Sequence, residues 1–145
     1  MRRDPQTLAM NQKSIYEADT IRQAAIEGCL TGVRDVRRPF NVTESNSDFV
    51  GLDRNNKSID VELKTVAFDK IHKRSLDTQV NDIGRNANDR LQSQSNILLI
   101  CDVSSAPDFI RKAIASNITD LVQPDLRDKL SFVYNQHPEP NLPNI

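Results

Sequence analysis

The feature that most constrains the fold is a nearly continuous apolar run at residues 96–103, NILLICDV. A strand with one buried face alternates apolar and polar residues, whereas this run is apolar at almost every position. Such a run is typical of a strand buried on both faces, and sheets with strands of this kind are usually covered by helices on both sides. The run therefore predicts an α/β fold.

The patterns around this run predict the order of the other elements. Apolar residues recur at helical spacing in three segments, at about residues 14–30, 77–93 and from 106 or 107 to 121. Strand patterns fall at residues 33–40, 48–52, 58–67 and 130–134, with a polar hairpin turn at 53–57. Ser14 and Glu17 have the spacing of a capping box at the start of the first helix. The order α-β-β-β-α-β-α-β predicts a central mixed β-sheet flanked by helices on both faces.

Length and composition limit the number of domains and the class of protein. The 145 residues fit one domain, and 37% hydrophobic residues suffice for one core. We expect a flexible N-terminal segment at 1–13, one folded domain at 14–134 and a disordered tail at 135–145. The sequence contains no run of 18 apolar residues, so we expect no membrane span. It has no apolar stretch after its N-terminus either, so we expect no signal peptide.

Cysteine spacing and net charge narrow the possible functions. Cys29 and Cys101 lie far apart without a CxxC partner, so we expect two buried thiols and no zinc site. The net charge is −1, whereas a general nucleic-acid binder is usually more basic. Contact with a nucleic acid would therefore need a local basic surface or the help of a partner.

The residues with the clearest chemistry are two carboxylates and a lysine on adjacent expected strands. Glu62 and Lys64 share one face of their strand, because side chains alternate, and Asp48 begins the neighbouring strand across the hairpin. Two adjacent carboxylates repel each other unless a proton or a cation joins them, and hard oxygen ligands suit Mg²⁺ or Mn²⁺. The alternative is a plain Glu62–Lys64 surface ion pair, which contributes about 0–1 kcal/mol.

Hydrolysis of a phosphodiester can use this arrangement. A divalent ion polarises a phosphoryl oxygen and lowers the pKa of a bound water. Asp48 and Glu62 would hold the ion, with the carbonyl of Leu63 as a further ligand, while Lys64 orients the water or neutralises charge on the phosphate. Asp60, on the same face, either adds a ligand or lies at the rim.

Asp48, the hairpin and Glu62-x-Lys64 together resemble the signature of the PD-(D/E)XK nuclease superfamily, with Ser47 in place of the proline. The order of elements is similar as well, and it implies a restriction-endonuclease-like fold. Over residues 14–134 the layout, with Thr65 after Lys64, is most like the C-terminal nuclease toxin domains of contact-dependent growth inhibition proteins. The superfamily often carries a glutamate on its first helix, which makes Glu17 a catalytic candidate; the alternative for Glu17 is capping alone.

The resemblance implies a metal-dependent endonuclease that cuts tRNA or DNA and uses Mg²⁺ or Mn²⁺ in preference to Zn²⁺. It also implies that the chain is secreted as part of a larger exported protein and acts in the cytoplasm of a target cell. A cognate immunity protein would block it, and a host protein is a further candidate partner. No association with a membrane is expected.

We expect substrate contacts from Thr65, from Lys70 and Lys73 in a basic loop after the motif, and from Arg85 on the second helix. The alternative for the loop and the helix is an ordinary solvated surface. Two other functions remain open. One is a restriction-type or junction-cleaving enzyme of the same superfamily acting on duplex DNA, and the other is a non-enzymatic, immunity-like α/β domain that binds a partner.

Overall fold

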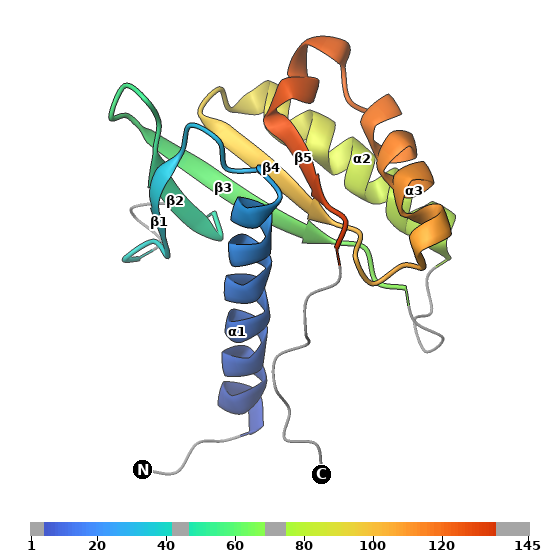
Figure 1. Cartoon of the computed structure of the whole chain (residues 1–145), viewed down its shortest axis with the longest axis horizontal. Helices are drawn as coiled ribbons and strands as arrows, with labels where there is room; N and C mark the ends of the chain where they lie inside the picture. The colour runs from blue at the N-terminus through green and yellow to red at the C-terminus, as the bar shows by residue number, and fades with distance from the viewer. Residues whose placement is uncertain (1–4, 42–46, 69–74, 136–145) are drawn as a thin grey trace.

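The computed structural model describes residues 5–41, 47–68 and 75–135, with side chains from residue 14 onward. These residues form a single small α/β domain (Figure 1). The elements are α1 Pro5–Ile26, β1 Arg34–Arg37, β2 Phe49–Leu52, β3 Ser58–Thr65, α2 Leu76–Ser93, β4 Ile97–Asp102, α3 Asp108–Asp120, the 3₁₀ helix η1 Pro124–Lys129 and β5 Leu130–Val133. The predicted order of elements is confirmed, and η1 is the only addition among the described residues.

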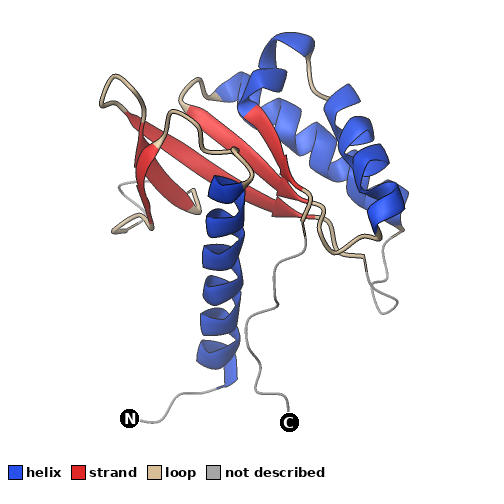
Figure 2. Cartoon of the chain, viewed as in Figure 1, coloured by secondary structure: helices blue, strands red, loops and turns tan. Residues whose placement is uncertain are grey.

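The strands form one mixed sheet in the order β1-β2-β3-β4-β5. β1, β2 and β3 are antiparallel neighbours, and β4 and β5 continue the sheet parallel to β3. The turn at 53–57 joins β2 to β3 as predicted: Asp53 N donates to Lys57 O at 2.9 Å, and Asn56 takes a left-handed φ of 61°. Figure 2 shows the sheet with helices on both sides.

β4 is buried on both faces, as its apolar sequence predicts. Ile97 and Leu99 point into a cluster with Leu91 of α2 and residues of α3. Ile100 points the other way, into a smaller cluster with Ala24 of α1. The sheet therefore separates α1 from α2 and α3, and the predicted mixed sheet with helices on both faces is confirmed (Figure 1).

The first helix does not have the predicted bounds. It begins at Pro5 instead of near Ser14 and ends at Ile26, so Ser14 and Glu17 lie inside it and the predicted capping box is wrong. Apolar periodicity marks where a helix packs, but the backbone continues as long as no breaker intervenes. None does between Pro5, which is tolerated in a first turn, and Gly28, whose φ of 84° ends the helix. Residues 136–145 of the expected tail lie outside the described residues.

Both cysteines are free thiols, and the predicted burial is confirmed for Cys101 but not for Cys29. Cys101 is fully buried, and burial raises its pKa. Cys29 is partly buried and donates from Sγ to Phe132 O at 3.3 Å; burial, with a smaller effect of Glu27, raises its pKa to about 11. No helix in the described part of the chain is long and apolar enough to cross a membrane.

We predict that Gly84→Ala weakens the contact between α2 and α3. A Cβ at Gly84 would lie 2.5 Å from Leu121 Cδ1 and 2.8 Å from Leu121 Cβ, so one helix must shift. Overpacking costs about 1–3 kcal/mol, which outweighs the helix propensity of alanine at about 1 kcal/mol. Urea denaturation should show a lower free energy of unfolding. Asn86→Ala, at an exposed position of α2, is the control; an equal effect of both changes would contradict the close contact.

Candidate active site

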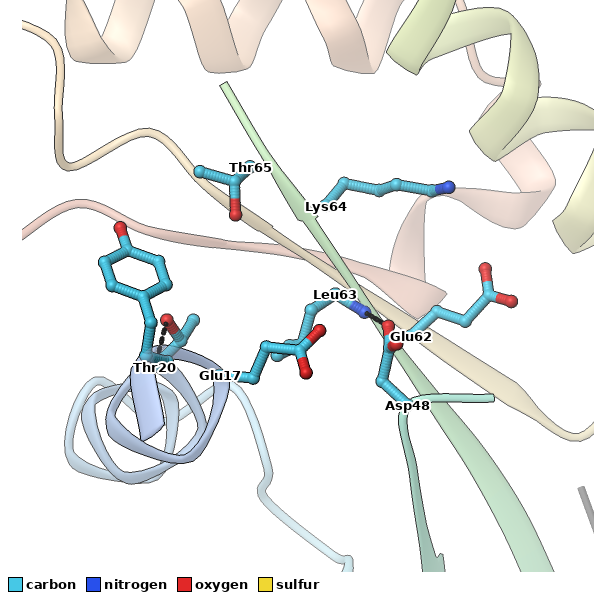
Figure 3. Close-up of a pocket in the computed structure, with 8 residues that line it drawn as sticks. Glu17, Thr20, Asp48, Glu62, Leu63, Lys64 and Thr65 are labelled. Carbon is cyan, nitrogen blue, oxygen red and sulfur yellow. Dashed lines mark hydrogen bonds between the residues drawn. The ribbon is translucent and has the colours of Figure 1, made fainter. Parts of the chain in front are cut away.

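The site forms where β2 and β3 separate. β2 begins at Phe49, opposite Val61, while β3 continues to Thr65 beside β4. The N–H of Leu63 points to the β2 side, because Asp60 and Val66 donate their N–H groups toward β4 and alternate residues point in opposite directions. This N–H donates to Asp48 Oδ2 at 2.9 Å (Figure 3). The Asp48 side chain thus replaces the strand partner that the backbone of β2 no longer supplies.

A cavity of about 560 Å³ opens at this point. α1 lines one side of it, and the start of β2 and the second half of β3 line the rest (Figure 3). Its lining residues are Tyr16, Glu17, Thr20, Asp48, Glu62, Leu63, Lys64 and Thr65. Five side chains expected to be catalytic or to touch substrate are therefore brought together: Glu17, Asp48, Glu62, Lys64 and Thr65.

Glu62 and Lys64 point to the same face of β3, as alternation predicts. Lys64 is paired in register with Cys101, whose side chain lies in the cluster below α2 and α3. Figure 3 shows the Glu62 and Lys64 side chains extending to one side of β3, with Glu17 approaching Asp48 from the other side. Asp48 therefore lies between carboxylates from two faces of the sheet.

Arg90 of α2 neutralises Glu62. Its Nη2 donates to Glu62 Oε1 at 2.7 Å, and only 15% of the Glu62 side chain is exposed. Glu62 Oε2 is buried too, and none of the described residues donates a hydrogen bond to it. Within the described chain the ion pair of Glu62 is with Arg90 and not with Lys64, so the alternative of a Glu62–Lys64 surface pair does not form. A buried carboxylate oxygen without a donor is costly, and a bound cation or water would satisfy it.

Arg38, just after β1, neutralises Glu17. Its Nη1 donates to Glu17 Oε1 at 2.9 Å and its Nη2 to the carbonyl of Ser14 at 3.1 Å. The guanidinium also lies over the ring of Phe49, 4.3 Å from the centroid. Arg38 therefore ties α1 to the β1–β2 edge beside the cavity.

The donor set of the cavity suits a hard cation that keeps much of its hydration shell. Among the residues that the structure describes, no three Asp, Glu, His or Cys side chains are grouped closely enough to hold an ion. Asp48 and Glu62 could supply two carboxylates and Leu63 a carbonyl, which fits Mg²⁺ or Mn²⁺ with bound waters. Zn²⁺ prefers histidine and cysteine ligands, and none lines the described cavity. Asp60 accepts from Gln94 and does not line the cavity.

Among the expected substrate-binding residues that the structure describes, Thr65 lines this cavity and Arg85 does not. Lys70 and Lys73 lie outside the described residues. Arg85 is exposed and stands two positions before buried Ala87, which places it on the side of α2 that faces away from the sheet. The structure therefore does not bring Arg85 to the cavity.

Sequence reasoning missed three residues of the site, Tyr16, Thr20 and Arg38, and did not single out Arg90 from the other polar residues of the second helix. Tyr16 donates to Asp102 Oδ2 at 2.9 Å, and that carboxylate is fully buried at the end of β4. Tyr16 and Thr20 are one helical turn apart, so their spacing with Glu17 could have marked the inward side of α1. Nothing in the local sequence singles out Arg38 or Arg90, because their partners lie 21 and 28 residues away.

Comparison with known proteins adds no relative to this picture. No family model matches the chain, and neither the curated proteins nor the solved structures contain a significant match. The cavity combines the carboxylates of Glu17, Asp48 and Glu62 with the amine of Lys64. That combination can bind a divalent ion and an anionic group together.

We predict that Arg90→Leu destabilises the domain by about 1–3 kcal/mol, because it leaves the Glu62 carboxylate largely buried without its donor. The double change Arg90→Leu with Glu62→Leu should recover most of the loss, since no charge is then left unpaired. Urea denaturation of the wild type, the two single variants Arg90→Leu and Glu62→Leu, and the double variant gives the coupling energy. Arg85→Leu, exposed on the same helix, is the control. Equal losses of unfolding free energy for Arg85→Leu and Arg90→Leu would mean that the Arg90–Glu62 pair does not stabilise the fold.

Proposed function

We propose that this chain is a metal-dependent endonuclease of the PD-(D/E)XK type. The observation that carries the proposal is the Asp48 carboxylate held 2.9 Å from Leu63 N, directly beside Glu62 and in the same cavity as Lys64. The register supports it: Phe49 lies opposite Val61, so the next positions along the two strands are Asp48 and Glu62. A rigid sheet holds both carboxylates, as a site with fixed geometry requires.

We propose a role for each of these residues. Asp48 and Glu62 would hold Mg²⁺ or Mn²⁺, which when bound polarises the phosphoryl oxygen and acidifies a water. Arg90 fixes the orientation of Glu62 by binding Oε1, while Oε2 has no donor among the described residues. Lys64 would neutralise charge developing on the phosphate or orient the attacking water. Glu17, held by Arg38, faces the same cavity from α1 and would position that water.

The substrate and biological setting follow from the resemblance alone. The layout is similar to that of contact-dependent growth inhibition toxins, so we propose tRNA as the substrate in preference to DNA. On the same ground we propose release into a target cell as part of a larger exported protein, and inhibition by an immunity protein. The alternative is a junction-cleaving or restriction-type enzyme that acts on duplex DNA. Cleavage of tRNA or of duplex DNA distinguishes the two.

A non-enzymatic partner-binding domain is the second candidate, and specific contacts favour it. Glu17 and Glu62 are each already neutralised by an arginine, and Asp48 already has a structural partner in Leu63 N. All three carboxylates therefore have a role that needs no metal. Binding of a divalent ion is the property that separates this candidate from the nuclease.

We predict that Asp48→Asn, Glu62→Gln and Lys64→Met each lower the rate of phosphodiester cleavage by at least about 10²–10³-fold, the usual cost of losing one electrostatic contact to a transition state. Asn at position 48 can still accept from Leu63 N through its amide oxygen, so this variant loses the charge but keeps the fold. Glu17→Gln should have a smaller effect. Gels of total tRNA and genomic DNA incubated with purified protein and Mg²⁺ measure the rates.

Asp89→Asn is the matched control, because this carboxylate is exposed on α2 and does not line the cavity. Circular dichroism should show the same fold for every variant. If the wild type cuts neither tRNA nor DNA with Mg²⁺ or Mn²⁺ and does not inhibit growth when expressed inside bacteria, the nuclease proposal fails.

We also predict that Mg²⁺ or Mn²⁺ stabilises the folded chain. Stabilisation equals RT ln(1 + [L]/Kd), so a free ion concentration ten times Kd adds about 1.4 kcal/mol, or roughly 3–6 °C in Tm for a domain of this size. Differential scanning calorimetry with the ion and with EDTA measures the shift. Glu62→Gln should remove the shift and Asp89→Asn should retain it. A shift that survives Glu62→Gln would place the ion elsewhere.

A further inference from the structure

A cation and an aromatic ring are stacked on the exposed surface beside β1. The Arg37 guanidinium lies 4.0 Å from the centroid of the Phe40 ring. Phe40 is nevertheless 80% exposed, so its ring is accessible to a ligand. The proposed catalytic roles use neither residue.

The register places this Arg37–Phe40 pair at the cavity end of the sheet. Arg37 is opposite Val50 in the antiparallel β1–β2 ladder, so the chain after Arg37 runs along the start of β2, toward Asp48. Arg38, between the two stacked residues, donates to Glu17 and, at 3.4 Å, to the carbonyl of Asp48. The pair therefore flanks the cavity at the β1 edge.

Three arginines are grouped around the pair although the whole chain has a net charge of −1, and two of them, Arg34 and Arg38, also contact a carboxylate. Arg34, Arg37 and Arg38 follow one another along β1 and just beyond it, all exposed. The one acidic residue of β1, Asp35, is paired with Arg34. Charge of this kind matches the phosphates of a nucleic acid better than a hydrophobic protein surface.

The backbone of β1 is a poor site for an additional protein strand. β1 pairs with β2 at Arg34–Leu52 and at Arg37–Val50, so β1 has one more residue than β2 between these two pairs. The extra residue forms a β-bulge, and Asp35 in this stretch takes a left-handed φ of 56°. Bulges and charged side chains at an edge disfavour pairing with another strand. This edge therefore offers its side chains, and not its backbone, to a partner.

We propose that Arg37 and Phe40 form a stacking platform for an unpaired base of a single-stranded nucleic acid, with Arg34 and Arg38 near its phosphates. Bases in a duplex are already stacked on each other, whereas unpaired bases stack on aromatic rings and guanidinium planes. The inference rests on the proposed function and narrows its substrate to single strands or loops, in preference to uninterrupted duplex.

Fluorescence anisotropy with EDTA present tests this proposal without cleavage. The probes are a labelled single-stranded oligonucleotide, as RNA and as DNA, and a duplex of the same sequence. Phe40→Ala should weaken single-strand binding about 5- to 150-fold, the usual 1–3 kcal/mol per stacked base, and leave duplex binding unchanged. Phe40→Tyr should bind like the wild type because it keeps the ring. Phe109→Ala is the matched control, since this phenylalanine is 85% exposed on α3.

The platform proposal fails if Phe40→Ala leaves the affinity for the single strand unchanged. It also fails if Phe40→Ala and Phe109→Ala lower that affinity equally, or if Phe40→Ala lowers the affinity for single strand and duplex equally. The absence of binding to any of these probes would overturn it as well. Cleavage by the wild type, measured separately with Mg²⁺, distinguishes the two proposals. Cleavage with no effect of Phe40→Ala on binding retains the nuclease and rejects the platform. Binding that depends on Phe40 without any cleavage retains the platform and rejects the nuclease.

Discussion

The hydrogen bond from Leu63 N to the Asp48 carboxylate both satisfies a backbone group of the sheet and positions a carboxylate in the cavity. β2 and β3 must separate for a cavity to open between them, and separation leaves a strand N–H without a backbone partner. An unpaired buried N–H is costly, so a side chain has to supply the acceptor. Asp48 does so, and the same contact holds its carboxylate beside Glu62. Asp48 thus both stabilises the separation of β2 from β3 and supplies a carboxylate to the proposed metal site.

Two arginines make this concentration of acidic groups tolerable. Glu17, Asp48 and Glu62 line one cavity and would repel one another if all were unpaired. Arg38 neutralises Glu17 from the β1 side, and Arg90 neutralises Glu62 from α2. Each pair also fixes a helix against the sheet, α1 through Arg38 and α2 through Arg90. Electrostatic balance in the cavity and the packing of the helices therefore depend on the same contacts.

Sequence reasoning succeeded where the signal was local. The apolar run of β4, the hairpin turn at 53–57 and the alternation along β3 each reflect the geometry of one or two elements, and all three predictions are confirmed. The predicted start of α1 was wrong because apolar spacing marks only the packed stretch of a helix. The helical backbone itself extends further, from Pro5 to the breaker Gly28. The capping role of Ser14 and Glu17 failed for the same reason.

The sequence by itself determined that a covered mixed sheet would form and that Glu62 and Lys64 would share a face, because both follow from side-chain period and chain order. Only the tertiary structure decided how the acidic groups are neutralised and where α1 supplies Glu17 to the cavity. Those contacts join elements distant along the chain. They depend on how β2 separates from β3 and on how the helices dock, and no local pattern of residues encodes either of these.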